Sequence, residues 1–218
     1  MLNEMKTKTI SISNLFLWLH YWLQYLVIPI RKHECFIKNI VNKYARDQRV
    51  KVLDFGCGEG VFSKLFLRMA NVDYVGYDKN YVCLQFARKF AKDSKFVLGN
   101  EQLCIPGEVF DFVLLHNVMH HMNDREVCVL VSELKRILKQ GAFVIVVELT
   151  IRKNQKGLFF RFVTFWEERL KKIRYCGDSF FSKFFAPHFE EIYSEKISAN
   201  FLFRLFKISG GSQEISKN

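Results

Sequence analysis

Short apolar runs alternate with amphipathic segments through the middle of the chain. The runs Val50–Asp54 and Ala142–Glu148 are almost continuously hydrophobic, which is typical of strands buried on both faces of a parallel sheet. Between such runs, apolar residues recur at helical spacing, as they do over residues 61–70 and 123–139. This alternation predicts an α/β fold in which helices cover both faces of a mostly parallel sheet.

The predicted elements fill the chain from residue 33 to residue 208. Seven strands are expected, at residues 50–54, 73–77, 95–98, 110–115, 142–148, 189–197 and 200–208. The last two are expected to form a C-terminal pair, with an antiparallel strand, that closes the sheet. The predicted helices are residues 33–46, 61–70, 80–92, 123–139 and 157–173.

Residues 10–30 form a run of 21 residues without Asp, Glu, Lys or Arg. On a helical wheel Ser13, His20 and Gln24 share one face and large apolar residues fill the other, so we predict an amphipathic helix that ends near Pro29. Three roles stay open: a lid or packing helix, which we favour, a helix in a membrane interface, and a membrane-spanning helix. We therefore divide the chain into a helical lid or membrane-interface segment at 1–46 and a main domain at 47–218.

The positive charge lies at the two ends of the chain. The net charge of +11 divides into +5 for residues 1–50, 0 for 51–150 and +6 for 151–218. Residues 151–218 also hold twelve of the 23 Phe, most of them in a Phe-rich insertion at about 152–188. A basic and aromatic surface fits an anionic membrane, a nucleic acid or a hydrophobic acidic substrate, or it is simply a solvated surface over an ordinary core.

The six cysteines are widely spaced, and no CxxC pair exists. A zinc ribbon and a thioredoxin-like motif are therefore disfavoured, and we expect no metal. No small-residue cleavage site follows the apolar run, so we expect reduced thiols and a cytoplasmic protein, at most peripheral at the inner face of a membrane.

A glycine cluster follows the first predicted strand, in the sequence Leu53-Asp54-Phe55-Gly56-Cys57-Gly58-Glu59-Gly60. Glycine lets the backbone turn sharply and approach a ligand closely, and the next helix offers its N-terminus to that ligand. The spacing is G-x-G-x-G, because residue 61 is Val where a dinucleotide fingerprint needs its third glycine. No G-K-[ST] follows, so the loop is not a P-loop either.

This loop resembles motif I of the class I S-adenosylmethionine-dependent methyltransferases, and further segments match that family in order. Val75–Asp78 resembles its second strand, which ends in the acidic residue that holds the ribose, and Gly99–Leu103 is similar to the loop that meets adenine, although Asn100 stands where Asp is usual. Residues 110–121 and 134–142 resemble the fourth strand and the junction into strand five, where Gly141 is expected to cap the helix. The resemblance is to the small-molecule subgroup, of type 11 or ubiquinone-menaquinone-biosynthesis-like, and implies a Rossmann-like, doubly wound sheet of seven strands.

The resemblance also implies roles for residues of the cofactor site. Those that would bind S-adenosyl-L-methionine are Asp54, Gly56, Cys57, Gly58, Gly60, Asp78, Lys79, Asn100, Glu101 and the backbone of His116. Within this set Asp54 would act through water on the methionine end, Asp78 would bind the ribose and Lys79 would flank the adenine. Cys57 is interpreted as a small loop filler rather than a nucleophile.

Histidine is the usual side chain for removing a proton from a hydroxyl acceptor near neutral pH. His116, His120 and His121 follow the fourth strand and are the candidate catalytic bases, although histidines at this position can simply bond to the backbone. His20, His33 and His188 are expected to be structural or exposed.

The sequence argues against several acceptor classes. The place of a [DN]-P-P-[FYW] motif reads His116-Asn117-Val118-Met119, and no Pro-Cys pair exists. We therefore expect direct methyl transfer to a hydrophobic small-molecule or lipid-like acceptor, with a pocket lined by the Phe-rich segment and with peripheral membrane contact through residues 10–30. Two alternatives stay open: an RNA methyltransferase that uses the basic flanks, and a non-catalytic protein that binds the cofactor or a membrane. The oligomeric state is not predicted. The eight Phe expected to line the pocket, each of which could instead be an ordinary core residue, are Phe159, Phe160, Phe162, Phe165, Phe180, Phe181, Phe184 and Phe185.

Overall fold

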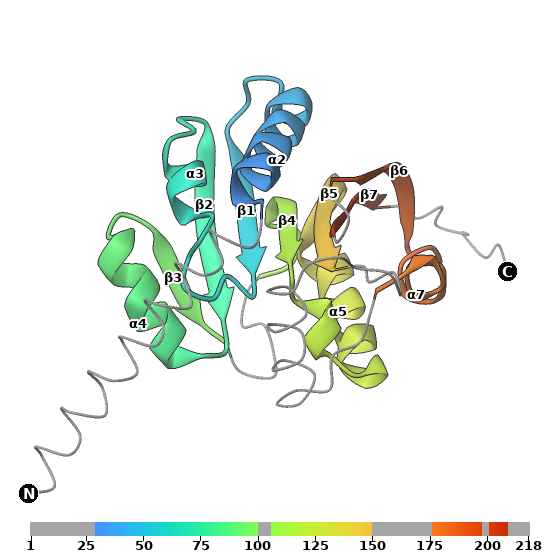
Figure 1. The fold of residues 1–218 in the computed structure, drawn as a ribbon. Helices are drawn as coiled ribbons and strands as arrows, with labels where there is room; N and C mark the ends of the chain where they lie inside the picture. The colour runs from blue at the N-terminus through green and yellow to red at the C-terminus, as the bar shows by residue number, and fades with distance from the viewer. Residues whose placement is uncertain (1–28, 100–105, 150–175, 198–200, 209–218) are drawn as a thin grey trace, which may run out of the picture.

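The computed structural model describes residues 29–99, 106–149, 176–197 and 201–208 (Figure 1). Strands and helices alternate through most of this part, as the hydrophobic pattern predicts. The elements are α2 (Ile30–Ala45), β1 (Val50–Phe55), α3 (Ser63–Leu67), β2 (Val72–Asp78), α4 (Tyr81–Phe90), β3 (Lys95–Leu98), β4 (Phe110–His116), the 3-10 turn η1 (Met119–His121), α5 (Asp124–Ile137), β5 (Leu138–Leu149), α7 (Asp178–Phe184), β6 (Phe189–Lys196) and β7 (Phe201–Ile208).

The strands form one sheet of seven in the order β3-β2-β1-β4-β5-β7-β6. β1 lies between β2 and β4 and runs parallel to both, while β7 is antiparallel to β5 and to β6. This order confirms the predicted doubly wound, mostly parallel sheet. The strand order reverses at the boundary between β1 and β4, and ligands of such sheets bind beside that point, at the carboxyl ends of the strands.

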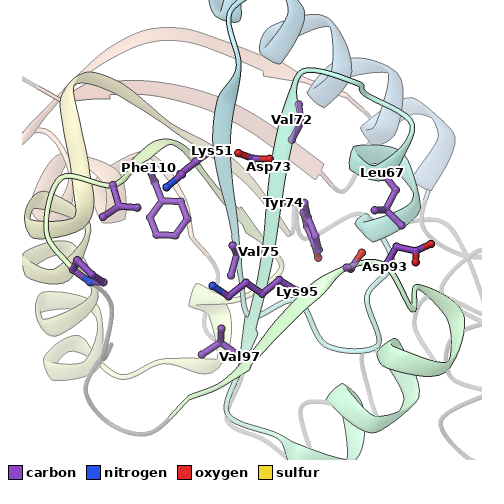
Figure 2. Close-up of a pocket in the computed structure, with 13 residues that line it drawn as sticks. Lys51, Leu67, Val72, Asp73, Tyr74, Val75, Asp93, Lys95, Val97 and Phe110 are labelled. Atoms are coloured by element: carbon purple, nitrogen blue, oxygen red, sulfur yellow. The ribbon is translucent and has the colours of Figure 1, made fainter.

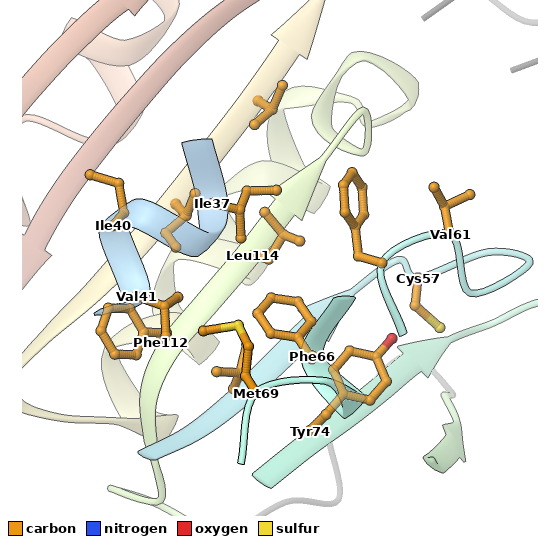
Figure 3. Packing of buried hydrophobic residues seen from close by; sticks show 14 of the residues in the cluster. Ile37, Ile40, Val41, Cys57, Val61, Phe66, Met69, Tyr74, Phe112 and Leu114 are labelled. Atoms are coloured by element: carbon orange, nitrogen blue, oxygen red, sulfur yellow. The ribbon is translucent and has the colours of Figure 1, made fainter. Parts of the chain in front are cut away.

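Helices cover the two faces of the sheet separately. α2, α3 and α4 pack on one face, where the alternate residues Val52, Phe112 and Leu114 contribute to the core. Figure 3 shows Ile37, Ile40 and Val41 of α2 over this face, near Phe66 and Met69. α5 and α7 pack on the other face, against residues of the opposite strand parity such as Leu53, Val113 and Val144.

Pro29 and Arg46 are the N-cap and C-cap residues of α2, and a φ of +47° places Arg46 in the left-handed region. Its buried side chains recur at the spacing of one helical face, so the helix is held by packing on the sheet. α2 thus belongs to the same core as the strands. Its first turn lies near the carboxyl end of β4, because His33 contacts His116, the last residue of that strand.

Two boundaries differ from the prediction. The helix expected over 61–70 is only Ser63–Leu67, because Val61 and Phe62 belong to the turns that leave the glycine loop. The helix expected over 123–139 ends at Ile137, and β5 begins directly at Leu138. Gly141 therefore does not cap that helix, which corrects the prediction. It lies inside β5 with φ +74°, at the irregularity where the β4–β5 register shifts.

The prediction that the Phe-rich segment lines a pocket is wrong for the residues described. Phe180, Phe181, Phe184 and Phe185 are all buried, and they pack with α5 and β7 in the core of the second face. Phe185 contacts the rings of Phe181, Phe189 and Phe206. α7 is therefore a packing helix, and the other four Phe of the prediction, along with the whole of the expected helix 157–173, lie outside the described residues.

The predicted helix at 10–30 also lies almost wholly outside the described residues. In the part of the chain that the structure describes, no helix has the length and apolar character needed to cross a membrane.

The packing of α7 leads to a stability prediction. Phe185 is fully buried, so Phe185→Ala should lower the free energy of unfolding by about 3–5 kcal/mol, because a large cavity is left among aromatic rings. Urea unfolding followed by circular dichroism measures the change. Val129→Ala, on the exposed side of α5, is the control and should change stability by about 0.5 kcal/mol or less. A small effect of Phe185→Ala would show that this ring is not part of the core.

Candidate functional site

The glycine loop is fixed to the end of the neighbouring strand β2. The N–H groups of Gly56 and Cys57 both donate to the carbonyl oxygen of Tyr77, at 2.7 and 3.0 Å. Gly56, Gly58 and Gly60 all have positive φ, between 53° and 77°. A Cβ atom at Gly56 would lie 2.6 Å from Val118, whereas one at Gly58 would meet no atom within 4 Å. The loop is therefore packed against the turn after β4 at Gly56 and open at Gly58.

Asp78 places its carboxylate at the open part of this loop. Its two oxygens accept hydrogen bonds from the N–H of Gly58, at 2.8 Å, and from the N–H of Asn80, at 2.7 Å. Asn80 in turn caps α4 by accepting from the N–H groups of Val82 and Cys83. Leu98 pairs with Asp78 across the β2–β3 ladder, and its side chain is 49% exposed. A carboxylate and an apolar surface thus lie side by side, as a nucleoside with a ribose diol and a flat base requires.

Asp54 lies at the base of the loop and is fully enclosed. Its carboxylate accepts a hydrogen bond from the Tyr74 hydroxyl of β2 at 2.9 Å. Burial raises the pKa of Asp54 to about 7, an effect that the Tyr74 hydrogen bond opposes and the nearby charge of Asp78 reinforces. Burial also raises the pKa of the Cys57 thiol, so this side chain fits the predicted role of loop filler and not that of a nucleophile.

The turn after β4 is organised by Glu148, which is fully buried at the end of β5. One carboxylate oxygen accepts from the N–H groups of Val118 and Met119, at 2.8 and 2.7 Å. The other lies 2.9 Å from Nδ1 of His120, which is also buried. With Nδ1 carrying the proton toward the carboxylate, Nε2 of His120 keeps its lone pair and can accept a proton.

His116 ends β4 and contacts α2. Its Nε2 lies 3.0 Å from Nδ1 of His33, and its ring packs edge-on against Phe62. Burial lowers the pKa of His116 well below the usual range, and the nearby His33 and His120 lower it further. An imidazole that resists protonation is a poor base for a hydroxyl, so His116 is a poor candidate for the proton acceptor.

The structure brings most of the predicted site residues to one edge of the sheet. Asp78 and His116 are the last residues of β2 and β4, and the glycine loop and His120 follow the carboxyl ends of β1 and β4. Lys79 and His121 are exposed beside them, and the His121 ring lies 3.9 Å from that of His120. Asn100 and Glu101 lie outside the described residues, so their expected contact with adenine stays a prediction.

Sequence reasoning missed three side chains that contact residues of the candidate site: Tyr74, Glu148 and His33. A glutamate at the end of an otherwise apolar strand was the available signal for Glu148, because a buried carboxylate needs a partner. His33, expected to be structural or exposed, is fully buried beside His116. Nothing in the local sequence indicates that contact, since the two residues are 83 positions apart.

A cavity of about 620 Å³ lies elsewhere, along the amino-terminal parts of β1, β2 and β3. Figure 2 shows Lys51, Asp73 and Lys95 of these strands at its wall, with Phe110 at the start of β4. None of its lining residues belongs to the glycine loop or to the turn after β4. This cavity is therefore distinct from the candidate site, which lies at the opposite ends of the strands. Among the described residues, no three His, Cys, Asp or Glu side chains come together as a metal site.

Comparison with known proteins agrees with this geometry. Residues 53–146 match the family model described as a methyltransferase domain. The chain is 25% identical over 120 residues to a ubiquinone biosynthesis O-methyltransferase of Pelagibacter ubique, and this match covers 53% of the chain and 48% of the relative. It is 36% identical over 103 residues to the protein of the same name from Rhizobium rhizogenes, with 44% and 41% covered. The chain thus spans about half or less of the length of these curated relatives.

Among solved structures, the PH0226 protein of Pyrococcus horikoshii has a TM-score of 0.66 at 19% identity, with 83% of this chain and 91% of that chain covered. This similarity supports the Rossmann-like fold. The family match over residues 53–146 confirms the resemblance found in the sequence to the S-adenosylmethionine-dependent methyltransferases, and both curated relatives carry the name of a small-molecule methyltransferase.

The buried carboxyl of Asp54 leads to a prediction about pH. Because the pKa of Asp54 is about 7 in the folded protein and about 4 in the unfolded chain, the folded state binds more protons between these values. Asp54 therefore reduces stability as the pH rises from about 4 to about 7. Asp54→Asn keeps an oxygen for the Tyr74 hydroxyl and removes the titration.

The measurement is urea unfolding of both proteins at pH 5 and pH 8. At each pH, the free energy of unfolding of the natural protein is subtracted from that of the Asn variant. This difference should be larger at pH 8 than at pH 5 by about 2 kcal/mol. Other titrating groups, His33 and His116 among them, contribute to both proteins and cancel in the difference. An equal difference at the two pH values would contradict the raised pKa.

Proposed function

We propose that this protein transfers a methyl group from S-adenosylmethionine to a hydroxyl group of an apolar small-molecule acceptor. The observation that carries the proposal is the bond from the N–H of Gly58 to the carboxylate of Asp78, which joins the glycine loop and the acidic end of β2 into one binding edge. The base at His120 supports a hydroxyl acceptor. The names of the two curated relatives, both O-methyltransferases, point the same way.

The residues at this edge fit the parts of the cofactor. The open backbone at Gly58 would receive the methionine end, and Asp78 would accept hydrogen bonds from the ribose hydroxyls. The half-exposed side chain of Leu98 would lie under the adenine ring. Asp54 is close enough to Asp78 for the two charges to interact, so a cationic ligand beside them would favour the ionised form of Asp54.

When bound, S-adenosylmethionine supplies an electrophilic methyl group that a nucleophile attacks directly from the side opposite to sulfur. The protein must align the acceptor, exclude water and remove a proton. Nε2 of His120 would take the hydroxyl proton as the oxygen attacks. Glu148 holds the ring in the required orientation and stabilises the imidazolium that forms. Because Glu148 also binds two backbone N–H groups, the base and the turn beside the glycine loop are positioned by one carboxylate.

The first prediction from this proposal concerns cofactor binding. Asp78→Ala should raise the Kd for S-adenosylhomocysteine at least about tenfold, because two hydroxyl hydrogen bonds to a carboxylate are lost. Isothermal titration calorimetry measures the Kd. Asp93→Ala removes an exposed carboxylate at the opposite edge of the sheet and should leave the Kd unchanged. Equal affinities of the natural protein and the Asp78 variant would remove Asp78 from the cofactor site.

The second prediction concerns the base. Glu148→Gln preserves size and an oxygen for the backbone N–H groups but cannot stabilise an imidazolium, so kcat should fall about 10²-fold or more. His120→Gln should cause a similar loss, while the Kd for S-adenosylhomocysteine stays close to that of the natural protein. Labelled-methyl transfer to fractionated small-molecule and lipid extracts provides the assay, and His188→Gln is the control.

The two variants at Glu148 and His120 should also not be additive, because both remove the same base. Full activity of His120→Gln with loss in His121→Gln would assign the base to His121 and contradict the proposed role of Glu148.

A further inference from the structure

The cavity of about 620 Å³ lies beside a free edge of β2, at the opposite end of the strands from the candidate site. β2 begins at Val72, whereas its pairing with β3 begins only at Val75 and Lys95. Residues 72–74 therefore extend past the start of β3, and they line the cavity together with Asp93 and Lys95 on the β3 side (Figure 2). A cavity of this volume is large enough for a small-molecule ligand.

Aliphatic side chains form the floor of this cavity on the face of the sheet that α5 covers. Val75, Val97 and Val109 are half-buried and pack against the core of that face. Two aromatic residues also line the cavity, but Tyr74 is only 7% and Phe110 only 3% exposed, so neither offers an open ring on which a flat ligand could stack. An aliphatic floor of this kind suits an alkyl chain, which gains affinity from burial and needs no directional contact.

Two lysines flank the aliphatic floor. Lys51 pairs with Asp73 across the β1–β2 ladder, and Lys95 pairs with Val75 across the β2–β3 ladder. Paired residues and residues two apart along a strand face the same side of a sheet, so Lys51 and Lys95 lie on the face that carries Val75 and Val97. Figure 2 shows both lysine side chains extending toward the same side, with Val75 between them. The floor is therefore bordered by two ammonium groups.

The acidic residues at the cavity do not cancel this positive charge. Asp73 is already bound by the guanidinium of Arg49, through three contacts of 2.6 to 3.1 Å. Asp93 is exposed to solvent. Counted with Arg49, the three basic side chains exceed the two acidic ones by one charge. One positive charge in excess matches a ligand that is a monoanion.

We propose that this cavity binds a fatty-acid-like ligand, a carboxylate on a single alkyl chain, as a second site apart from that of methyl transfer. The ammonium groups of Lys51 and Lys95 would hold the carboxylate by charge-assisted hydrogen bonds. The alkyl chain would lie on Val75 and Val97 and displace water from them. The inference does not depend on the proposed function, because none of the lining residues belongs to the glycine loop or to the turn after β4.

Three probes separate the parts of this ligand: octanoate, 1-octanol, which keeps the alkyl chain without the charge, and acetate, which keeps the charge without the chain. Backbone amide shifts in nuclear magnetic resonance spectra of the isotope-labelled protein give both the Kd and the place of binding. Octanoate should bind about fivefold or more tightly than 1-octanol, because of the two lysines. It should bind at least about a hundredfold more tightly than acetate, because of its buried chain. The shifts should centre on Lys51, Val75 and Lys95.

Charge variants test the headgroup contacts. The double variant Lys51→Gln with Lys95→Gln should lose the preference for octanoate over 1-octanol, while its Kd for 1-octanol stays the same within about twofold. Asp73→Asn removes a negative charge beside Lys51 and should tighten octanoate binding about twofold or more. Lys89→Gln with Lys92→Gln is the matched control, because it removes two exposed lysines that do not line the cavity. It should keep the preference of the natural protein.

Repeating the octanoate titration with saturating S-adenosylhomocysteine distinguishes the two sites. An unchanged Kd supports a separate cavity site. Shifts centred on the glycine loop, or octanoate binding that S-adenosylhomocysteine abolishes, would place the probe in the candidate site and overturn this inference. Acetate that binds as tightly as octanoate, or a preference that survives in the double variant of Lys51 and Lys95, overturns it as well. Failure of the protein to bind S-adenosylhomocysteine overturns only the proposed function.

Discussion

The attachment of the glycine loop to the end of β2 is the constraint on which the candidate site depends. A loop with three residues at positive φ has few conformations available, and the carbonyl of Tyr77 selects one of them by accepting two consecutive N–H groups. Asp78 then binds the N–H of Gly58 from the side. The parallel pairing of β1 and β2 makes both contacts feasible, because it brings Phe55 level with Tyr77 at the same edge of the sheet.

The other half of the site is held by the neighbouring pair, β4 and β5. Their parallel register brings His116 level with Val147, so the next residue of β5, Glu148, reaches the turn that follows β4. A buried carboxylate is costly unless it is fully hydrogen-bonded, and here it is satisfied by two backbone N–H groups and an imidazole. The same bonds that stabilise this carboxylate fix the geometry of His120. In this way stability and the orientation of the proposed base have one physical origin.

α2 links the N-terminal part of the chain to this site. Its apolar face packs on the sheet with Ile37 and Val41, and its His33 meets His116 in the same core region. The Phe residues are most abundant in the C-terminal part of the sequence, but not all of them lie near the candidate site. The Phe of α7 stabilise the far side of the molecule, while Phe62 and Phe201 contact the two imidazoles at the site.

The sequence by itself determined the fold class, a doubly wound and mostly parallel sheet of seven strands. It also singled out Gly58 and Asp78, which the structure brings into contact. These features follow from short-range patterns, since buried parallel strands require continuous apolar runs and a tight loop requires glycine. Local patterns could not show that β5 begins at Leu138, or that Gly141 lies inside this strand and does not cap the preceding helix. Both depend on the pairing of Leu138 with Phe110 of β4, which is distant in the sequence.

Only the tertiary structure showed that Glu148 orients His120, that Tyr74 binds Asp54 and that His33 contacts His116. Each of these contacts joins residues at least 20 positions apart, and burial, which the sequence does not specify residue by residue, sets the protonation of the groups involved.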